Sequence, residues 1–363
     1  MSLNSYRAKR DAAKTPEPVP ADHEESVDHT GDEQEGRGDR FVIQEHHATA
    51  LHWDIRLQRD GVLVSWAVPK GVPLDPATNH LAKQTEDHPE SYESFSGEIP
   101  KGQYGGGTMS IWDTGTYELE KWRDREVKLT LHGSRFGGRY VFFRTRGNDW
   151  MLHRMDPSPD GWSPLPDGLC PMTGRPGQLP RDDATWNYDI AWDGVRVLVA
   201  VDGGRLTVTD DGGANVTSSY PELRGLGLQL GSRQALLDGE IVAFGQDGGV
   251  DAERLRTRVG TAKPKPAQLK STPVQLLLTD LLQLEGRSML DEPHTGRRAA
   301  LESLELGGDQ WQVPDTFHGN GKAVLQAAQA QHLKGVIAKR RNSTYEPGRE
   351  SDSWRTVEPK RRG

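Results

Sequence analysis

The sequence predicts two domains, an all-β barrel or sandwich followed by an α+β domain. The chain has 363 residues, and domains of roughly 150 residues are usual, so two separate cores are expected. From Phe41 to about Asp156, short alternating segments are separated by glycines, which is typical of an all-β domain. Beyond residue 171, strand-like segments mix with stretches in which apolar residues recur at helical spacing.

The expected strands of the first domain follow one another closely. Apolar and polar residues alternate along them, as in strands with one buried face. The segments are FVIQ, LHWDIRLQ, VLVSWAV, GTMSIWDTGTYEL, VKLTLHG, GRYVFFRT and DWMLHRM. The proline-rich stretch PSPDGWSPLPDGLCP at 157–171 is the expected linker. We therefore place an N-terminal arm at 1–39, the first domain at 40–156 and the second at 172–363.

The second domain mixes both kinds of element. Its expected strands are YDIAWDGVRVLVAV, RLTVTD, ALLDGEIVAF and VQLLLTDLLQL. Its expected helices are GRRAALESLEL and GKAVLQAAQAQHL. No repeat of fixed period is visible in the sequence, so a solenoid is not expected.

Composition indicates a soluble protein of a reducing compartment. The apolar fraction is 34%, and no run approaches the roughly 18 apolar residues of a membrane span. The opening MSLNSYRAKRDAAKTPEP has no apolar segment behind its basic residues, so we expect no secretory signal and a cytoplasmic location. The single cysteine, Cys170, cannot pair within the chain and excludes a cysteine-rich zinc site, so any metal needs histidines and carboxylates.

The net charge of −8 is unevenly distributed. Between Asp22 and Glu35 there are seven acidic residues and no lysine or arginine, which predicts a disordered, solvated segment. Residues 331–363 carry nine Lys or Arg against four Asp or Glu. Such a basic stretch is either a solvated surface or a contact for phosphates, and charge alone favours the solvated surface.

The stretch HHATALHWDIRLQ, which begins at His46, is the first sign of a functional site. A strand here would place His52, Asp54 and Arg56 on one face, opposite an apolar one. Two neutral imidazoles, with His46 joining from a preceding turn or strand, and one carboxylate are a frequent ligand set for manganese, iron or zinc. Arg56 could bind an anion held there. The alternative is a half-exposed strand facing water, but five of the twelve histidines fall within residues 46–88, and this clustering favours a site.

Further candidates lie close by in the sequence. EDHPESY holds His88 and Tyr92 four residues apart, and SWAVPKG holds Lys70 after a proline. Each could be structural, but a phosphate site would use all three as donors. GQYGGGT at 102–108 lacks the lysine and the strand–helix context of a nucleotide-binding loop, so a tight turn is expected.

Together these residues resemble the 3'-phosphoesterase domain of the bacterial end-joining DNA ligase D family. The resemblance lies in QEHHATALHWDIRLQRDGVLVSWAVPKG and EDHPESYESFSGEIPKGQYGGGTMSIWDTG and runs over nearly all of residues 40–156. It implies a compact β-barrel that holds Mn²⁺ or another divalent metal. It also implies a metal-assisted phosphoryl transfer to water that removes a 3'-terminal ribonucleoside and then the 3'-phosphate of a DNA primer.

The resemblance also assigns roles to individual positions. It implies three metal ligands: His46, His52 and Asp54. It implies three residues that engage the scissile phosphate: Arg56, His88 and Tyr92. Further substrate-binding positions, the last three of them in an N-terminal arm, match Lys70, Glu86, Arg10, Asp11 and Glu17. Because ligand histidines must be neutral, activity is expected to fall at acid pH.

Two features depart from the family's pattern. His80 stands where the family usually has arginine, which either weakens phosphate binding or leaves histidine as the donor. The acidic segment after Pro20 makes the arm longer than the family's. Both departures bear on whether the first domain is catalytic.

The second domain resembles the nucleotidyltransferase domain of ATP-dependent DNA ligases. NYDIAWDGVRVLV at 187–199 matches its first motif. Further matches follow in order: LLDGEIVAF around Glu240, TDLLQLEGRSML, and KGVIAKRRNSTYEPGRESDSW. They cover roughly residues 170–360 and imply an α+β nucleotidyltransferase-like domain with antiparallel sheets.

Several functional positions of that family differ here. Ala191 replaces the nucleophilic lysine, so the enzyme–nucleotide phosphoramidate cannot form there. Asp193 and Arg196 keep the family's residue types, and Lys339 remains at a phosphate-contacting position. Lys334 replaces a glutamate of the metal-associated motif. Other departures are Thr279, Thr356 and Glu358. ATP is therefore not expected to be a productive cofactor.

Three functions remain open. We favour a metal-dependent phosphomonoesterase and phosphodiesterase that heals DNA 3' ends, with a ligase-like domain that positions DNA or docks a partner. The alternatives are a non-catalytic end-joining scaffold and an active DNA ligase, which Ala191 opposes. The resemblance implies primer–template or double-strand-break ends as substrates. It implies a Ku-type protein, a repair polymerase and a separate ligase as partners, at the bacterial nucleoid and without a membrane.

Overall fold

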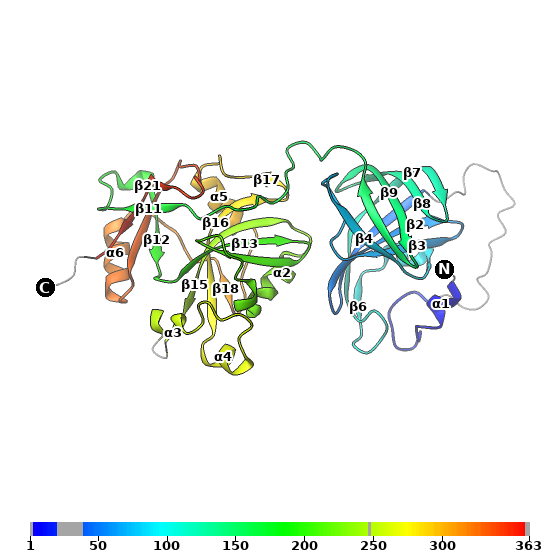
Figure 1. Cartoon of the computed structure of the whole chain (residues 1–363), viewed down its shortest axis with the longest axis horizontal. Coiled ribbons are helices and arrows are strands. Elements are labelled where there is room, and N and C mark those ends of the chain that lie inside the picture. Colours follow the sequence, from blue (N-terminus) through cyan, green and yellow to red (C-terminus); the bar gives the residue numbers. More distant parts are fainter. Residues whose placement is uncertain (1–2, 20–38, 246–247, 360–363) are drawn as a thin grey trace. The chain divides into compact units, whose positions relative to one another are not determined.

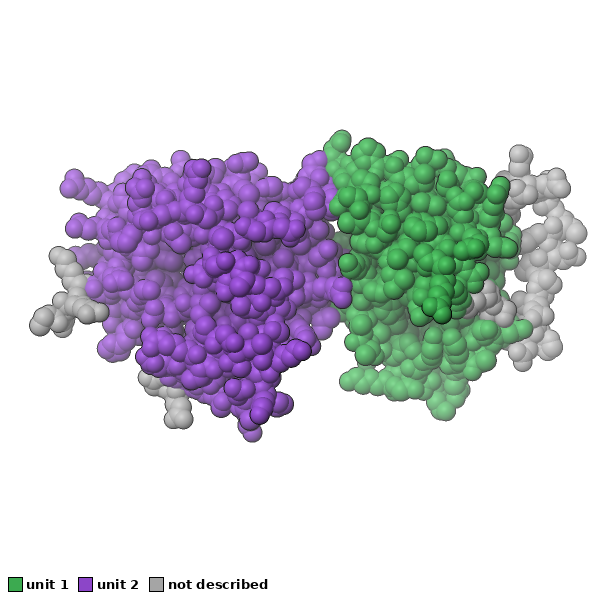
Figure 2. Space-filling model, viewed as in Figure 1, with its two compact units in different colours: residues 1–160 green, residues 161–363 purple. Residues whose placement is uncertain are grey.

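The structure is a computed structural model, and it divides the chain into two compact units. The units are Met1–Asp160 and Gly161–Gly363 (Figure 2). The structure describes residues 3–19, 39–245 and 248–359. The predicted disordered segment from Asp22 to Glu35 lies outside the described residues. Within the described ranges, no helix is both long and apolar enough to cross a membrane.

Unit 1 is a closed antiparallel barrel, which settles the alternative between barrel and sandwich (Figure 1). Its strands are β1 (Arg40–His47), β2 (Leu51–Arg59), β3 (Val62–Val68), β4 (Asn79–Gln84), β5 (His88–Pro89), β6 (Gly97–Ile99), β7 (Gly107–Arg123), β8 (Glu126–Gly133), β9 (Gly137–Arg146) and β10 (Asp149–Arg154). The ring runs β1-β2-β3-β4-β10-β9-β8-β7, and β7 pairs back onto β1. Strands β5 and β6 pair at its margin with β3 and β7.

The apolar face of β2 lies in the barrel core, as the alternation predicts. Four of its residues are buried there: Leu51, Trp53, Ile55 and Leu57. They pack with residues of other strands, Trp66 of β3 and Phe142 of β9 among them. Because the side chains of a strand alternate between faces, the polar residues of β2 point away from this core.

The seam between β1 and β7 requires a glycine. Gly107 has φ +149°, and a Cβ there would lie 2.3 Å from the carbonyl oxygen of His47. A side chain at this position would push β7 away from β1. The glycine therefore permits the pairing in which Thr108 lies opposite His47.

The N-terminal arm docks on the barrel through its described residues. It begins with the short helix α1 (Leu3–Arg7). Tyr6 is fully buried in an apolar cluster that includes Leu63 and Tyr92, and its hydroxyl donates to the carbonyl of Pro18 at 2.8 Å. The arm therefore adds residues to the site described below.

Unit 2 contains two sheets flanked by helices (Figure 1). The first sheet has the order β11 (Thr173–Pro176), β21 (Glu350–Val357), β20 (Gly335–Arg340), β12 (Trp186–Ala191) and β19 (Phe317–His318). The second has the order β14 (Arg205–Asp210), β13 (Val195–Asp202), β15 (Ala235–Ala243), β16 (Val274–Leu284) and β17 (Arg287–Ser288), with β18 (Trp311–Gln312) beside β16. The helices are α2 (Arg224–Leu230), α3 (Ala252–Arg256), α4 (Pro266–Ser271), α5 (His294–Glu302) and α6 (Gly321–Ala330).

Both sheets are antiparallel except for the pairings β11–β21 and β16–β18. Strand β13 shows why its sequence is almost continuously apolar. Val197 and Val199 lie in the core that contains α2, whereas Leu198 packs on the other face in a cluster with Trp354 of β21. Both faces of this strand are buried. The α+β prediction for this unit is confirmed.

Candidate active site

The β1–β2 hairpin brings the predicted metal ligands together. His46 lies directly opposite His52, and Gln44 lies opposite Asp54. Side chains that are opposite each other in an antiparallel pair lie on the same face. The two imidazole rings are accordingly 4.7 Å apart, measured between centroids. A local hairpin register therefore places His46, His52 and Asp54 on one polar face.

The ligand atoms of these three residues lie within 4.8 Å of one another. His46 Nδ1 is 3.7 Å from Asp54 Oδ2, and His52 Nε2 is 3.8 Å from Asp54 Oδ1. Ligands about 2.1 Å from a metal lie roughly 3–3.5 Å apart, so small side-chain movements would complete a coordination sphere.

Backbone carbonyls orient both imidazoles toward Asp54. His46 Nε2 lies 2.8 Å from the oxygen of Gly105, and His52 Nδ1 lies 2.9 Å from the oxygen of Ala50. A carbonyl only accepts, so each of these nitrogens carries a proton and donates it. In the neutral rings the other nitrogens present lone pairs to Asp54. Two lone pairs and a carboxylate directed at one point are suited to a divalent cation.

Arg56 fixes the orientation of the carboxylate. It donates to Asp54 Oδ2 at 3.0 Å, to Gln44 Oε1 at 2.6 Å and to Ser65 Oγ at 3.0 Å. Burial alone would raise the pKa of Asp54, but the Arg56 guanidinium holds it well below its usual range. Asp54 is therefore ionised at neutral pH. Arg56 itself is only 2% exposed.

These residues line a cavity of about 230 Å³. Arg10 and Glu17 from the arm also line it, together with Glu86, His88 and Tyr92 from the barrel. Arg10 pairs with Glu17 at 2.8 Å and with Glu86 at 3.1 Å, and the Tyr92 hydroxyl donates to Glu17 at 2.9 Å. The arm is thus tied to the barrel through its predicted site residues.

His88 is neutral in this cavity. Burial and then the charges of Arg56 and Arg10 lower its pKa well below the usual value. Its Nδ1 lies 2.8 Å from the carbonyl oxygen of Glu86 and therefore carries the proton. The Nε2 atom is left as a hydrogen-bond acceptor.

Other predicted residues lie elsewhere. Lys70 is exposed in the turn after β3 and is not among the residues that line the cavity. Asp11 pairs with Lys14 at 2.8 Å on the surface of the arm, and both side chains are exposed. His80 bonds the carbonyl of Gly71 at 2.8 Å from β4. His47, which the sequence did not mark as a site residue, points to Glu45 at 2.6 Å. These four do not join the cluster in this structure.

In unit 2 the predicted nucleotide-site residues form two groups. Ala191 ends β12 opposite Gly335 and is buried. Just beyond it, Asp193 has a left-handed φ of +64° and pairs with Lys334 at 3.1 Å. On β13 and β15, Arg196 makes a bidentate pair with Asp238, whereas the backbone of Gly194 donates to Glu240.

Lys339 lies in a buried ion pair. Its ammonium is 2.8 Å from Asp189 Oδ2 and 4.2 Å from the centre of the Trp354 ring, and the Lys339 side chain is 1% exposed. Burial opposes ionisation of Asp189, but the Lys339 charge lowers the pKa of Asp189 to about 2. Lys339 is therefore already paired with a carboxylate of its own domain.

Sequence comparisons identify both units. Residues 44–144 match the family described as "DNA Ligase D 3'-phosphoesterase domain", and residues 179–357 match "ATP dependent DNA ligase domain". The chain joins a ligase D phosphoesterase domain to an ATP-dependent ligase domain. We call them the phosphoesterase domain and the ligase-like domain.

Curated relatives align with nearly the whole chain. The multifunctional non-homologous end joining protein LigD of Mycolicibacterium smegmatis is 41% identical over 97% of this chain and 45% of its own length. LigD of Pseudomonas aeruginosa is 30% identical over 97% of this chain and 46% of its own length. The chain thus spans about half the length of these relatives. Among solved structures, the ligase domain of Mycobacterium tuberculosis LigD is 33% identical, with a TM-score of 0.46 over 52% of this chain and 59% of that one.

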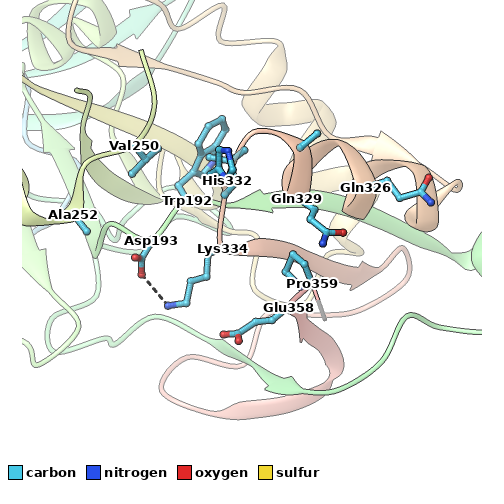
Figure 3. Close-up of a pocket in the computed structure, with 12 residues that line it drawn as sticks. Trp192, Asp193, Val250, Ala252, Gln326, Gln329, His332, Lys334, Glu358 and Pro359 are labelled. Carbon is cyan, nitrogen blue, oxygen red and sulfur yellow. Dashed lines mark hydrogen bonds and ion pairs between the residues drawn. The ribbon is translucent and has the colours of Figure 1, made fainter. Parts of the chain in front are cut away.

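A larger cavity, of about 1020 Å³, lies on the ligase-like domain (Figure 3). Trp192, Asp193, Lys334 and Glu358 line it, and the Lys334 side chain is directed at Asp193. Thus Lys334 and Glu358, two of the family departures, line the same cavity.

Some residues of the phosphoesterase site were not predicted from the sequence. Gln44 accepts a hydrogen bond from Arg56. Because Gln44 precedes His46 by two residues, strand alternation would have placed both side chains on the same face. The Gly105 carbonyl orients His46 from a turn that is far away in the sequence. Lys9 pairs with Glu86 at 2.9 Å and bonds Tyr104 at 3.2 Å. No local pattern points to these last contacts.

Proposed function

We propose that the chain is a metal-dependent phosphoesterase that heals DNA 3' ends in non-homologous end joining. It would remove a 3'-phosphate and also a 3'-terminal ribonucleoside. The observation that carries this proposal is the convergence of His46, His52 and Asp54 in one cavity with Arg10 and His88. Membership of the ligase D phosphoesterase family supports it.

The ligand set fits a divalent cation, for which we propose Mn²⁺. Two oriented imidazole nitrogens and one ionised carboxylate would hold it. A cation bound there would polarise a phosphoryl oxygen and neutralise the charge that develops on it.

The side chains of the protein would orient the metal ligand, bind the attacking water and bind the phosphate. Arg56 acts through Asp54, which it orients, because it is buried and its Nε, Nη1 and Nη2 atoms each bond a protein partner. Neutral His88 accepts a hydrogen bond from the attacking water through Nε2. Arg10 and Tyr92, which bond Glu17 in this structure, line the same cavity and would donate to an incoming phosphate.

The test is Mn²⁺-dependent release of phosphate from a primer–template with a 3'-phosphate. His46→Ala should lower the rate by more than the roughly 100-fold that loss of an outer partner of a metal ligand costs. His47→Ala is the matched control, because its side chain bonds Glu45 instead, and it should retain the wild-type rate. If His46→Ala kept full activity, the metal-ligand assignment would be wrong. If the wild type released no phosphate, the chain would be better described as a non-catalytic end-joining scaffold.

For the ligase-like domain we propose a role without covalent adenylation. Ala191 has no amine to attack ATP, and Lys334 faces Asp193 where the family has a glutamate. The domain would instead position DNA or dock a partner, such as a Ku-type protein, a repair polymerase or a separate ligase at the bacterial nucleoid.

A further inference from the structure

The mouth of the phosphoesterase cavity carries an exposed aromatic side chain. Tyr104 lies in the turn between β6 and β7, where Gly102 and Gly105 have φ of +91° and +76°. It lines the same cavity as the metal-ligand cluster, yet its exposed fraction is 49%. The glycine-rich stretch predicted only as a tight turn thus presents an aromatic ring at the site.

The arm holds this ring in place. Lys9 donates to the Tyr104 hydroxyl at 3.2 Å, and its ammonium lies 4.3 Å from the ring centre. The Arg10 guanidinium is 5.5 Å from the same centre. Lys9 is fixed in turn by Glu86 at 2.9 Å. A ring anchored by a hydrogen bond and two cations loses little freedom when a ligand packs on it.

The cavity is too small to enclose a nucleotide. Its volume of about 230 Å³ is below the roughly 300 Å³ at which pockets for small organic ligands begin. A phosphate at the metal-ligand cluster must therefore leave its nucleoside at the mouth, where Tyr104 lies. In proteins that bind single strands, aromatic side chains stack on bases, and each stack contributes about 1–3 kcal/mol for any base.

We propose that Tyr104 stacks on the nucleobase of the nucleotide that carries the 3'-phosphate. This inference rests on the proposed function, because it assumes that a DNA 3' end enters the cavity. It makes the site tolerant of base identity but dependent on the presence of a base.

The experiment compares two primer–templates, one with a 3'-terminal nucleotide and one with an abasic 3'-terminal residue, both bearing a 3'-phosphate. For the wild type, loss of the base should raise KM about 5- to 150-fold with little change in kcat. Tyr104→Leu should show the higher KM with both substrates, whereas Tyr104→Phe and Tyr104→Trp should behave like the wild type. Affinity for Mn²⁺ should be unchanged in all variants, which shows that Gly105 still orients His46.

Fluorescence anisotropy with the same oligonucleotides, without metal, measures stacking independently of catalysis. A wild type that releases no phosphate would defeat the proposed function but would leave this binding comparison intact. If Tyr104→Leu bound and processed both substrates as the wild type does, or if the wild type did not distinguish them in binding, the stacking inference alone would be wrong.

Discussion

The two candidate sites of the chain differ in what their charged residues face. In the phosphoesterase domain, His46, His52 and Asp54 direct acceptors at one another. In the ligase-like domain, Lys339 is paired with Asp189 and Lys334 with Asp193. Asp54 is also paired with Arg56, but two imidazole acceptors lie beside it, and convergent acceptors are what a cation needs. The two lysines are each satisfied by a carboxylate of the same domain. Under our proposal for the ligase-like domain, retention of a family's residue types does not by itself preserve a binding site.

The largest expected effect tests whether Lys339 has become structural. Lys339→Met leaves the buried Asp189 carboxylate unpaired, which should lower the free energy of unfolding by about 3–5 kcal/mol. At roughly 2–4 °C per kcal/mol, calorimetry should show the transition of the ligase-like domain lowered by roughly 6–20 °C. The double variant with Asp189→Asn should recover part of the loss.

Lys322→Met on the exposed face of α6 is the matched control and should change stability by less than about 0.5 kcal/mol. If Lys339→Met were as harmless as the control, the pair would not hold the domain together. The contrast between the two sites would then be lost.

A slightly smaller effect should appear when the ligase-like domain is acidified. Burial, reinforced by Lys339, lowers the pKa of His294 to about 4 from an ordinary 6.5. The unfolded chain therefore binds this proton first, and stability falls as the pH drops from about 6.5 to 4, by up to about 3 kcal/mol. Urea unfolding across this range should reveal the slope.

His294→Gln should flatten this slope, whereas His332→Gln, at an exposed position, should not. An unchanged slope in His294→Gln would mean that another group is responsible for the loss of stability.

A third prediction concerns orientation of the metal ligand in the phosphoesterase domain. Arg56→Lys keeps the charge but cannot make the three bonds to Asp54, Gln44 and Ser65. Phosphate release at limiting Mn²⁺ should fall about 10- to 100-fold and recover partly with excess metal. Arg59→Lys, at the last residue of the same strand, is the control. A loss in Arg56→Lys that excess Mn²⁺ did not relieve would point to direct phosphate contact instead.

The smallest expected change comes from restoring the nucleophile. Ala191→Lys should still show no covalent label with radioactive ATP, because Lys334, Thr356 and Glu358 also depart from the family pattern. Labelling is measured after denaturation, with an active ATP-dependent ligase as the positive control. A labelled variant would show that the rest of the nucleotide site is intact, and a labelled wild type would overturn the proposal for this domain.

The sequence predicted local features better than distant ones. The alternation in LHWDIRLQ correctly predicts which residues of β2 fill the core, because strand period is a local property. The choice of barrel over sandwich depends on the β1–β7 pairing, which joins residues more than 60 positions apart. Ion pairs such as Lys339 with Asp189 likewise join distant strands and leave no periodic trace.

The arm illustrates the same limit for site residues. Arg10 and Asp11 are neighbours in the sequence and both match the family's arm. In the structure Arg10 enters the cavity, whereas Asp11 faces solvent with Lys14. Sequence position alone cannot say which of two adjacent side chains turns inward, because Arg10 is held by residues that are distant in sequence, such as Glu86.

Gly107, at the pairing of β1 with β7, limits which inherited substitutions this protein can tolerate. Strand β1 both closes the barrel and carries His46, so closure and chemistry share one strand. A substitution of Gly107 that parts the strands would also move the turn that holds Gly105 against His46. Inherited variation at this position should therefore be felt as lost activity, although no atom of Gly107 needs to approach the DNA.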